Sequence, residues 1–248
     1  YPLTWQDICD IIHYYLVWCF EIDSKVGPDV VVHVDIIGKE FFCIDAGEQS
    51  KNLETYFQIL KILPENTNTI IAFGGGVVGD IAGFVASTYK RGIKLIIIPT
   101  TLLAMVDSSV GGKNGVDLGE KKNYVGTIYQ PSEVIIDISF LKTLSEKEFK
   151  NGLAEVIKYS YLFGSPSLDL IELKNLLDKN IEKIIIECCK NKVKIVEKDV
   201  FDKGYRHILN LGHTVGHAIE ILYNFSHGEA ISIGIVKELE IGNKLCII

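Results

Sequence analysis

The sequence predicts a doubly wound α/β domain over residues 1–144, followed by an all-helical domain over residues 145–248. Between residues 30 and 138, short apolar runs alternate with segments of helical periodicity, which is the pattern of a parallel α/β sheet. Beyond that region every periodic segment has helical spacing. The boundary is placed before Ser145, because Ser145 and Glu148 have the spacing of a capping box.

The expected elements follow from these patterns in chain order. Strands are expected where apolar residues run together, at Val30 to Ile37, Phe41 to Ile44, Thr69 to Phe73, Lys94 to Ile98 and Val134 to Ile138. Helices of the α/β part are expected at Asn52 to Leu63, which ends at Pro64, and at Gly76 to Tyr89 after a glycine turn. The helical part is expected to contain Ser145 to Leu162, Ser167 to Leu177, Ile181 to Lys198, Tyr205 to Tyr223 and Gly228 to Leu245.

Bulk composition excludes some classes of protein. The 248 residues carry a net charge of −7, and the lysines and arginines are scattered, so we expect no nucleic-acid partner. The apolar run Ile11 to Phe20 follows Asp7 and Asp10 and is too short to span a bilayer, so we interpret it as core and expect no membrane partner.

The cysteines indicate a reducing compartment. The 6 cysteines form no C-x-x-C pair and lie in apolar surroundings, which predicts buried, reduced thiols and a soluble, cytoplasmic protein. Both ends of the chain are expected to be cut, since it begins at Tyr1 and stops within a helical pattern.

A glycine cluster separates the strand ending at Phe73 from the following helix. Its order, Gly74-Gly75-Gly76-Val77-Val78-Gly79-Asp80, could let a diphosphate approach backbone N–H groups at the helix N-terminus. The alternative is that these glycines serve only a tight turn and close packing. Pro99 to Thr101 and Gly111 to Gly115 follow later strands and would line the same edge of the sheet, which favours a ligand site.

Histidines in the helical part have the spacing of metal ligands. His213 and His217 lie four apart on one expected helix, His227 follows closely, and Glu155 stands on another helix. Three such donors with one open position are typical of a catalytic zinc site, although a histidine pair at this spacing is often solvated or packed in the core. Spacing leaves open which of the three histidines is not a ligand.

Polar residues near these histidines suggest an anion site. Arg206, Asn210, His213 and His217 would form one stripe on a continuous helix, which could face a cleft or solvent. Lys158 and Lys192 lie on neighbouring helices. For Lys192 the ordinary explanation is solubility, because the surrounding segment is rich in lysine.

Several long blocks in the same order resemble the 3-dehydroquinate synthase family. The match runs from about Gly47 to the chain end and is carried by Gly74 to Asp80, Pro99 to Lys113, Lys122-Asn123, Gly152 to Lys158, Leu209 to Glu220 and His227 to Glu229. The resemblance implies a Rossmann-like NAD domain, a helical domain that binds a divalent metal (zinc, with cobalt as the other option) and substrate, and an active site between them. By this resemblance, Glu155, His213 and His227 would correspond to the family's metal ligands, and His217 would correspond to its catalytic histidine.

The resemblance also assigns the other site positions. Residues that match NAD contacts are Glu48, Lys51, Gly75, Gly76, Val77, Gly79, Asp80, Thr100, Thr101, Asp107, Lys113, Lys122, Phe140 and Thr143. Residues that match positions holding an anionic sugar phosphate are Asp107, Lys113, Asn123, Lys158, Lys192, Arg206 and Asn210. Arg91 resembles an arginine that the family contributes across a dimer interface, so a homodimer is expected.

The implied activity is that of a phosphate-eliminating lyase of the shikimate pathway, which converts 3-deoxy-D-arabino-heptulosonate 7-phosphate to 3-dehydroquinate. NAD would oxidise the C5 hydroxyl transiently so that phosphate can leave, the hydride would return, and an intramolecular aldol step would close the ring. The metal would polarise substrate hydroxyls and His217 would relay a proton.

The pattern departs from the family in three places. The helix expected between the first two strands is missing, the acidic ribose contact has only Asp35 as a candidate, and the C-terminal helices are absent from the segment. Alternatives are another sugar-phosphate cyclase of the valiolone or deoxy-inosose synthase type, a metal-dependent alcohol or glycerol dehydrogenase, and a non-catalytic remnant that binds NAD and metal.

Overall fold

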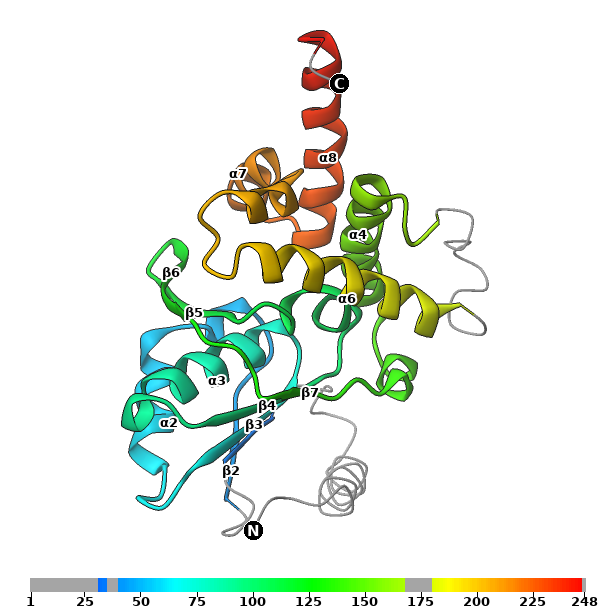
Figure 1. Cartoon of the computed structure of the whole chain (residues 1–248). Coiled ribbons are helices and arrows are strands. Elements are labelled where there is room, and N and C mark those ends of the chain that lie inside the picture. Colours follow the sequence, from blue (N-terminus) through cyan, green and yellow to red (C-terminus); the bar gives the residue numbers. More distant parts are fainter. Residues whose placement is uncertain (1–30, 35–39, 168–179, 247–248) are drawn as a thin grey trace.

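The computed structural model describes residues 31–34, 40–167 and 180–246 (Figure 1). The predicted core segment Ile11 to Phe20, the ribose candidate Asp35 and nearly all of the predicted helix Ser167 to Leu177 lie outside the described residues. Within them, an α/β layer carries a group of helices on one side, and the last helix projects away from the rest (Figure 1).

The main sheet is mixed. Its strand order is β2-β1-β3-β4-β7, with bounds Glu40–Cys43, Val31–Val34, Thr69–Gly74, Lys94–Pro99 and Glu133–Val134. Strands β3, β4 and β7 are parallel as predicted, whereas β1 runs antiparallel to both β2 and β3. The prediction of a parallel sheet is therefore wrong for β1 and β2, because only residues 35–39 separate them and a parallel crossover needs a dozen residues or more. The predicted last strand shortens to β7.

Alternation along β3 and β4 divides the core into two layers. Ile70 and Leu95 point toward helices α2 (Leu53–Ile62) and α3 (Gly76–Thr88), while Ile71 and Ile96 point toward the helical part. Both helices match their predicted ranges within a residue or two. One hydrophobic cluster thus contains residues of the sheet together with residues of the helical part, so the two parts share a buried interface.

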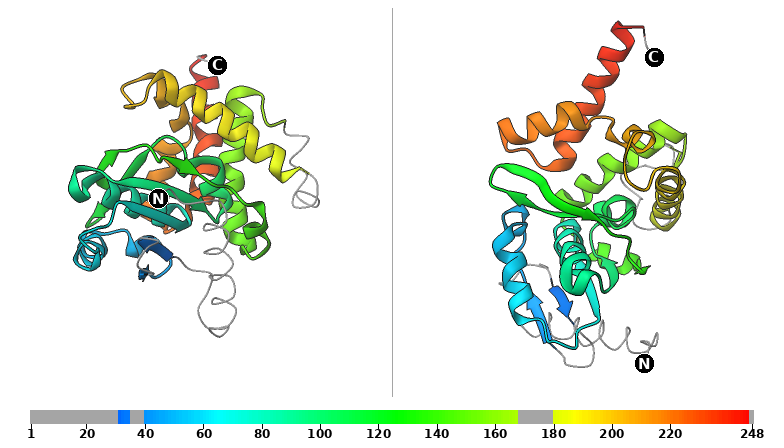
Figure 2. Two further views of the ribbon diagram at one scale, coloured as in Figure 1. Left: turned by 60° about the horizontal axis from the view of Figure 1, so that its bottom comes forward. Right: turned by 60° about the vertical axis from the view of Figure 1, so that its left-hand side comes forward.

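A β-hairpin of β5 (Lys113–Leu118) and β6 (Lys121–Ile128) was not predicted from the sequence. Its strands are rich in Lys, Asn and Gly, so the apolar alternation that marks a strand is weak. The hairpin packs on α3 at Gly83, where a Cβ atom would lie 1.8 Å from Asn114 Oδ1. It reaches from the α/β layer to the underside of helix α7 (Figure 2).

The helical part contains α4 (Glu146–Phe163), α6 (Ile181–Lys198), α7 (His213–Tyr223) and α8 (His227–Lys244). Ser145 caps α4 as predicted, since its hydroxyl accepts a 3.2 Å hydrogen bond from the N–H of Glu148. The division into domains at 144/145 stays a prediction; the described strands end at β7 and α4 begins at Glu146.

The prediction of one continuous helix from Tyr205 to Tyr223 is wrong, because the helix is interrupted between Asn210 and His213. A short 3₁₀ helix, η6 (Tyr205–Asn210), is followed by Gly212 at φ 82°, and α7 then starts in a new direction. Glu238 of α8 accepts hydrogen bonds from the N–H groups of Gly212 (2.6 Å) and Val215 (3.1 Å), which fixes the start of α7. Arg206 and Asn210 therefore do not share one helical stripe with the histidines.

Two further expectations are answered in part. Among the described cysteines Cys188 is buried, but Cys43 and Cys246 are exposed, so the prediction that the cysteines are buried is wrong for these two. Within the described ranges, the structure contains no helix with the length and apolarity needed to cross a membrane.

Candidate functional site

Three potential metal ligands meet where α4, α7 and α8 come together. Glu155 lies in α4, His213 is the first residue of α7, and His227 is the first residue of α8. The Nε2 atoms of His213 and His227 lie 3.7 Å and 3.4 Å from Oε1 of Glu155, and the three donor atoms are within 4.8 Å of one another. The geometry thus brings together the three residues that the resemblance assigned to the metal.

Glycines allow these helices to approach so closely. A Cβ atom at Gly228, next to His227, would lie 2.4 Å from the Cα of Asn151 in α4. At Gly152 it would lie 2.6 Å from the backbone nitrogen of Leu103, which follows β4. The absence of a Cβ atom at these two positions therefore allows α8 and the chain after β4 to come close to Glu155.

Glu155 is fully buried with unsatisfied acceptors. Its exposure is 0%, and among the described residues neither of its oxygens accepts a hydrogen bond of normal geometry. Burial raises its pKa, but the charge of Lys158, whose ammonium lies against Oε2, together with the two histidines, outweighs burial and lowers the pKa to about 2. The group is a carboxylate at neutral pH. Oε2 is paired with the Lys158 ammonium, whereas Oε1 faces the Nε2 atoms of both histidines and accepts no hydrogen bond from the described part of the chain, so Oε1 can accept a metal cation.

The three histidines differ electrostatically. Burial lowers the pKa values of His213 and His217, so both rings are neutral at pH 7. For His227 burial acts in the same direction, but contacts with Glu155 and Glu220 outweigh it and raise the pKa to about 9. His217 lies one turn beyond His213, with ring centroids 5.3 Å apart. It forms a second group of donors with Glu220 and His227, so His227 belongs to both groups.

Asp107, in the π-helical turn η3 (Ala104–Ser108), is the centre of a second charged cluster. Lys192 donates to its carbonyl oxygen (2.7 Å) and to Oδ1 (2.9 Å), and the hydroxyl of Tyr159 donates to the same Oδ1 at 2.6 Å. Burial opposes ionisation of Asp107, but Lys192 and Lys158 hold its pKa well below the usual range. Burial also lowers the pKa of Lys192, against the opposing pull of Asp107.

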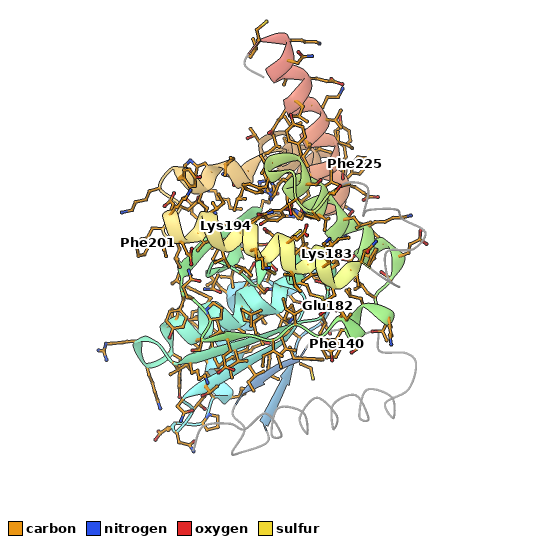
Figure 3. All side chains as sticks on the ribbon, turned by 45° about the vertical axis from the view of Figure 1, so that its right-hand side comes forward. Phe140, Glu182, Lys183, Lys194, Phe201 and Phe225 are labelled. Atoms are coloured by element: carbon orange, nitrogen blue, oxygen red, sulfur yellow. The ribbon has the colours of Figure 1, made fainter. Side chains whose placement is uncertain are left out.

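Lys192 does not behave like the lysines around it. Its exposure is 5%, whereas Lys183 and Lys194 lie on the solvent side of the same helix, α6 (Figure 3). Solubility explains those two exposed lysines, but it does not explain a buried ammonium that is bonded to Asp107.

The other candidate cations are engaged within the protein. The buried guanidinium of Arg206 donates to the carbonyl oxygens of Gly111 (2.8 Å) and Val200 (3.3 Å). Lys113 pairs with Asp202. An incoming anion would have to compete with these partners.

The remaining substrate candidates are more dispersed. Asn210 lines a hollow of about 470 Å³ with Thr214 and Glu238, a set that contains none of the three metal candidates. Asn123 has φ 53° in β6 and donates its N–H to Asp117 at 2.6 Å. Arg91 is exposed on the turn after α3.

The glycine turn lies at the carboxyl end of β3, with Gly75 as the N-cap of α3. A Cβ atom at Gly75 would come within 3.1 Å of Thr101, and one at Gly76 within 3.1 Å of Ser108, so the loops after β3 and β4 lie against each other here. This arrangement presents backbone N–H groups at a helix N-terminus beside the edge of a parallel sheet.

Lys51 and Asp80 add a buried ion pair beside this turn. Their charged atoms are 2.6 Å apart, and Lys51 is 4% exposed. Burial lowers the pKa of Lys51, but the charges of Asp80 and Glu48 outweigh it and raise the value overall. Burial raises the pKa of Asp80 despite the contact with Lys51.

The other predicted nucleotide contacts are placed as follows. Oε1 of Glu48 lies 3.7 Å from Nζ of Lys51. The N–H of Thr100 donates a 2.9 Å hydrogen bond to the carbonyl oxygen of Gly74. The ammonium of Lys122 pairs with the carboxylate of Glu220. Val77 and Gly79 are partly accessible in the first turns of α3. Phe140 is buried against Phe73, so its ring faces the core, and Thr143 lies exposed after it.

Three residues of the site were missed by the sequence analysis. Glu220 follows His217 by three residues on the same helix face and could have been found from that spacing. Tyr159 and Glu238 act through contacts with Asp107 and Gly212 that are distant in sequence, and no local pattern marks them.

These features define a class of protein in which a glycine-turn α/β sheet adjoins a helical part carrying a Glu–His–His cluster. Solved structures similar to this chain include a 2-deoxy-scyllo-inosose synthase complexed with carbaglucose-6-phosphate, NAD⁺ and Co²⁺, at 31% identity and TM-score 0.76 over 83% of this chain and 59% of that one. Another is a 2-epi-5-epi-valiolone synthase from Streptomyces hygroscopicus with NAD⁺ and Zn²⁺ bound, at 31% identity and TM-score 0.66 over 77% of this chain and 57% of that one.

The chain belongs to the 3-dehydroquinate synthase family. Residues 41–151 match the model of the family's N-terminal domain and residues 152–248 match that of its C-terminal domain. The 3-dehydroquinate synthase of Clostridium perfringens is 51% identical over 79% of this chain, and that of Alkaliphilus metalliredigens is 49% identical over 89%. The chain spans 59% and 65% of the lengths of these two relatives.

Proposed function

We propose that this chain provides the nucleotide-binding part and the metal-ligand cluster of a 3-dehydroquinate synthase, which converts 3-deoxy-D-arabino-heptulosonate 7-phosphate to 3-dehydroquinate and phosphate. The observation that carries the proposal is the buried Glu155 carboxylate, whose Oε1 lies beside Nε2 of His213 and His227 and accepts no hydrogen bond within the described residues. Two imidazoles and one carboxylate form a donor set that zinc and cobalt accept.

The residues present fit both groups that the related structures hold. Glu155, His213 and His227 would hold a divalent metal, and the turn from Gly75 to Asp80, with Thr101 and Lys51, would hold NAD. When bound, NAD would take up and return a hydride at the substrate's C5, and the metal would polarise the neighbouring hydroxyl oxygens.

The protein's own side chains have distinct parts in the proposal. The neutral ring of His217 can accept a proton from a substrate hydroxyl and pass it on. Lys158, Lys192 and Arg206 are buried cations that could exchange their present partners for a carboxylate or phosphate. Loss of phosphate breaks the carbon–oxygen bond and requires removal of a proton from the adjacent carbon.

Sequence identity favours this substrate over those of the other cyclases. The curated 3-dehydroquinate synthases are 42–51% identical to the chain, whereas the inosose and valiolone synthases with solved structures are 31% identical. The assigned positions Lys158, Arg206, Asn210 and His217 are present.

The test is phosphate release from the heptulosonate phosphate by the purified chain, with catalytic NAD, with and without EDTA, and with absorbance at 340 nm recorded in parallel. The proposal predicts release that EDTA abolishes without net build-up of NADH. Steady NADH formation with glycerol would instead favour a dehydrogenase. If the chain, and then the same chain extended to the length of its relatives, released no phosphate, the assignment would be overturned.

We also propose a two-domain homodimer acting in the cytoplasm, with Arg91 reaching the partner's site. Support comes from the exposed position of Arg91 beyond α3. Light scattering of the eluting protein tests this, because a monomer at micromolar concentration would contradict it.

A further inference from the structure

Glu220 lies between two features of the proposed site but belongs to neither set of predicted residues. It follows His213 and His217 at helical spacing on α7, and its side chain is 10% exposed. Its two carboxylate oxygens face different parts of the protein, so it is placed to connect them.

One oxygen faces a proposed metal ligand. Oε2 of Glu220 lies 3.8 Å from Nδ1 of His227, while Nε2 of the same ring faces Glu155 at 3.4 Å. A ring that binds a metal through Nε2 carries its proton on Nδ1, and metal-bound histidines usually donate that proton to a carboxylate or carbonyl. The 3.8 Å separation between Oε2 and Nδ1 is longer than a hydrogen bond, so this role requires the two side chains to move closer together when the metal binds.

The other oxygen faces the hairpin. Oε1 of Glu220, in α7, lies 2.5 Å from Nζ of Lys122, in β6. This ion pair crosses from the α/β part to the helical part.

The hairpin in turn is tied to the nucleotide edge. The N–H of Asp117 in β5 donates to the carbonyl of Lys51 at 2.8 Å, and Lys51 pairs with Asp80 beside the glycine turn. Strand β5 also packs along α3, the helix that the glycine turn begins. A ligand that orders this edge would therefore steady Lys122.

We propose that Glu220 is a positioning residue that orients His227 for the metal and, through Lys122, couples binding of NAD to binding of the divalent ion. This rests on the proposed function only in taking those two ligands as the occupants. Linkage requires the coupling to be reciprocal, so each ligand tightens the other by the same factor.

The test measures Co²⁺ affinity by chelator competition, with and without saturating NAD, for the wild-type chain, Glu220→Gln and Lys122→Met. Wild type should bind Co²⁺ several-fold more tightly with NAD present. Glu220→Gln should weaken Co²⁺ binding about 10- to 100-fold, the range found for partners of metal-bound histidines. Both variants should show the same Co²⁺ affinity with and without NAD. Because Lys122 is also a predicted NAD contact, NAD is added at a concentration that saturates each variant.

Matched controls separate this role from general loss of structure. Lys121→Met removes a neighbouring lysine of the hairpin that lies over the Tyr124 ring rather than against Glu220, and should keep the wild-type ratio. Glu240→Gln changes an exposed carboxylate on α8 and should do the same. Glu220→Asp should restore part of the metal affinity.

Three results would overturn the proposal: an unchanged Co²⁺ affinity in Glu220→Gln, no NAD effect in wild type, or an NAD effect that is retained in either variant. No substrate is present in this experiment. Failure of phosphate release would therefore count against the proposed function, while the binding ratios would still decide the role of Glu220.

Discussion

The carboxylate of Glu155, in α4, and that of Asp107, which is bonded to Tyr159 of α4, have very different surroundings. Asp107 accepts hydrogen bonds from Lys192 and Tyr159 on one oxygen, so groups of the protein itself already offset its charge. Glu155 is fully buried beside an ammonium and two imidazoles, and among the described residues its oxygens accept no regular hydrogen bond. The first arrangement stabilises the join between the sheet and the helices; the second leaves lone pairs for an ion.

Burial alone therefore does not identify a functional acid. Each carboxylate is ionised, because nearby cations outweigh the effect of burial on its pKa. They differ in how their oxygens are satisfied.

The largest effect is expected for Glu155→Gln. The change removes an anionic ligand and leaves a buried amide beside Lys158, so affinity for Zn²⁺ should fall more than about 100-fold. Isothermal titration of wild type, Glu155→Gln and the exposed control Glu148→Gln measures this. Equal affinities for Glu155→Gln and wild type would remove Glu155 from the metal site.

Asp107→Ala should act on stability rather than on metal binding. It leaves the buried Lys192 ammonium without its partner, and breaking such a pair costs about 3–5 kcal/mol when it is fully buried. Since the Asp107 side chain is 23% exposed, we expect about 2–3 kcal/mol. Urea unfolding measures the loss, with exposed Asp45→Ala as control; a change below about 0.5 kcal/mol would contradict the structural role.

Gly228→Ala should disturb the Glu155 cluster and leave the Asp107 cluster intact. The new methyl carbon would lie 2.4 Å from the Asn151 Cα, so backbone must move where α8 meets α4. We expect about 1–3 kcal/mol of destabilisation, as for overpacked cores, and weaker metal binding. Gly204→Ala, with no atom within 4 Å of the new carbon, is the control for both measurements.

The smallest effect is expected for the pH dependence of folding stability that Asp107 contributes. The pKa of Asp107 is depressed in the folded protein, so its contribution is present above the unfolded value of about 3.9 and is lost as pH falls below it. The stability gap between wild type and Asp107→Ala should therefore stay constant from pH 7 to pH 5 and narrow from about pH 4 downward. A gap that narrows between pH 7 and pH 5 would contradict this sign.

The sequence predicts the elements whose signals are local, that is, those that do not depend on a partner distant in the chain. Helix α6 was predicted with its observed ends, because apolar residues recur on one face and the pattern needs no distant partner. The glycine turn is also predictable, because its glycines are consecutive in the sequence and no distant residue is needed to recognise them. The break at Gly212 was missed, since it depends on Glu238, which lies on another helix and captures the N–H groups that a continuous helix would use.

Prediction of the site residues is limited in the same way, because it misses contacts between residues that are distant in sequence. Spacing located the histidine group but left open which member is not a ligand, and the structure places His227 in both donor groups. Lys192 was interpreted from sequence mainly as a solubility lysine, and only the fold shows that it is buried on Asp107. The antiparallel position of β1 and the polar hairpin likewise depend on pairing partners that are distant in sequence.

The most direct test of the central claim is zinc K-edge absorption of the loaded chain, compared between wild type, His213→Ala and His217→Ala. We expect two imidazole ligands and one carboxylate in wild type, at zinc–nitrogen and zinc–oxygen distances of about 2.0–2.2 Å. We expect one imidazole fewer in His213→Ala and no change in His217→Ala. Loss of an imidazole in His217→Ala with none lost in His213→Ala would contradict the assignment of Glu155, His213 and His227 as the metal site.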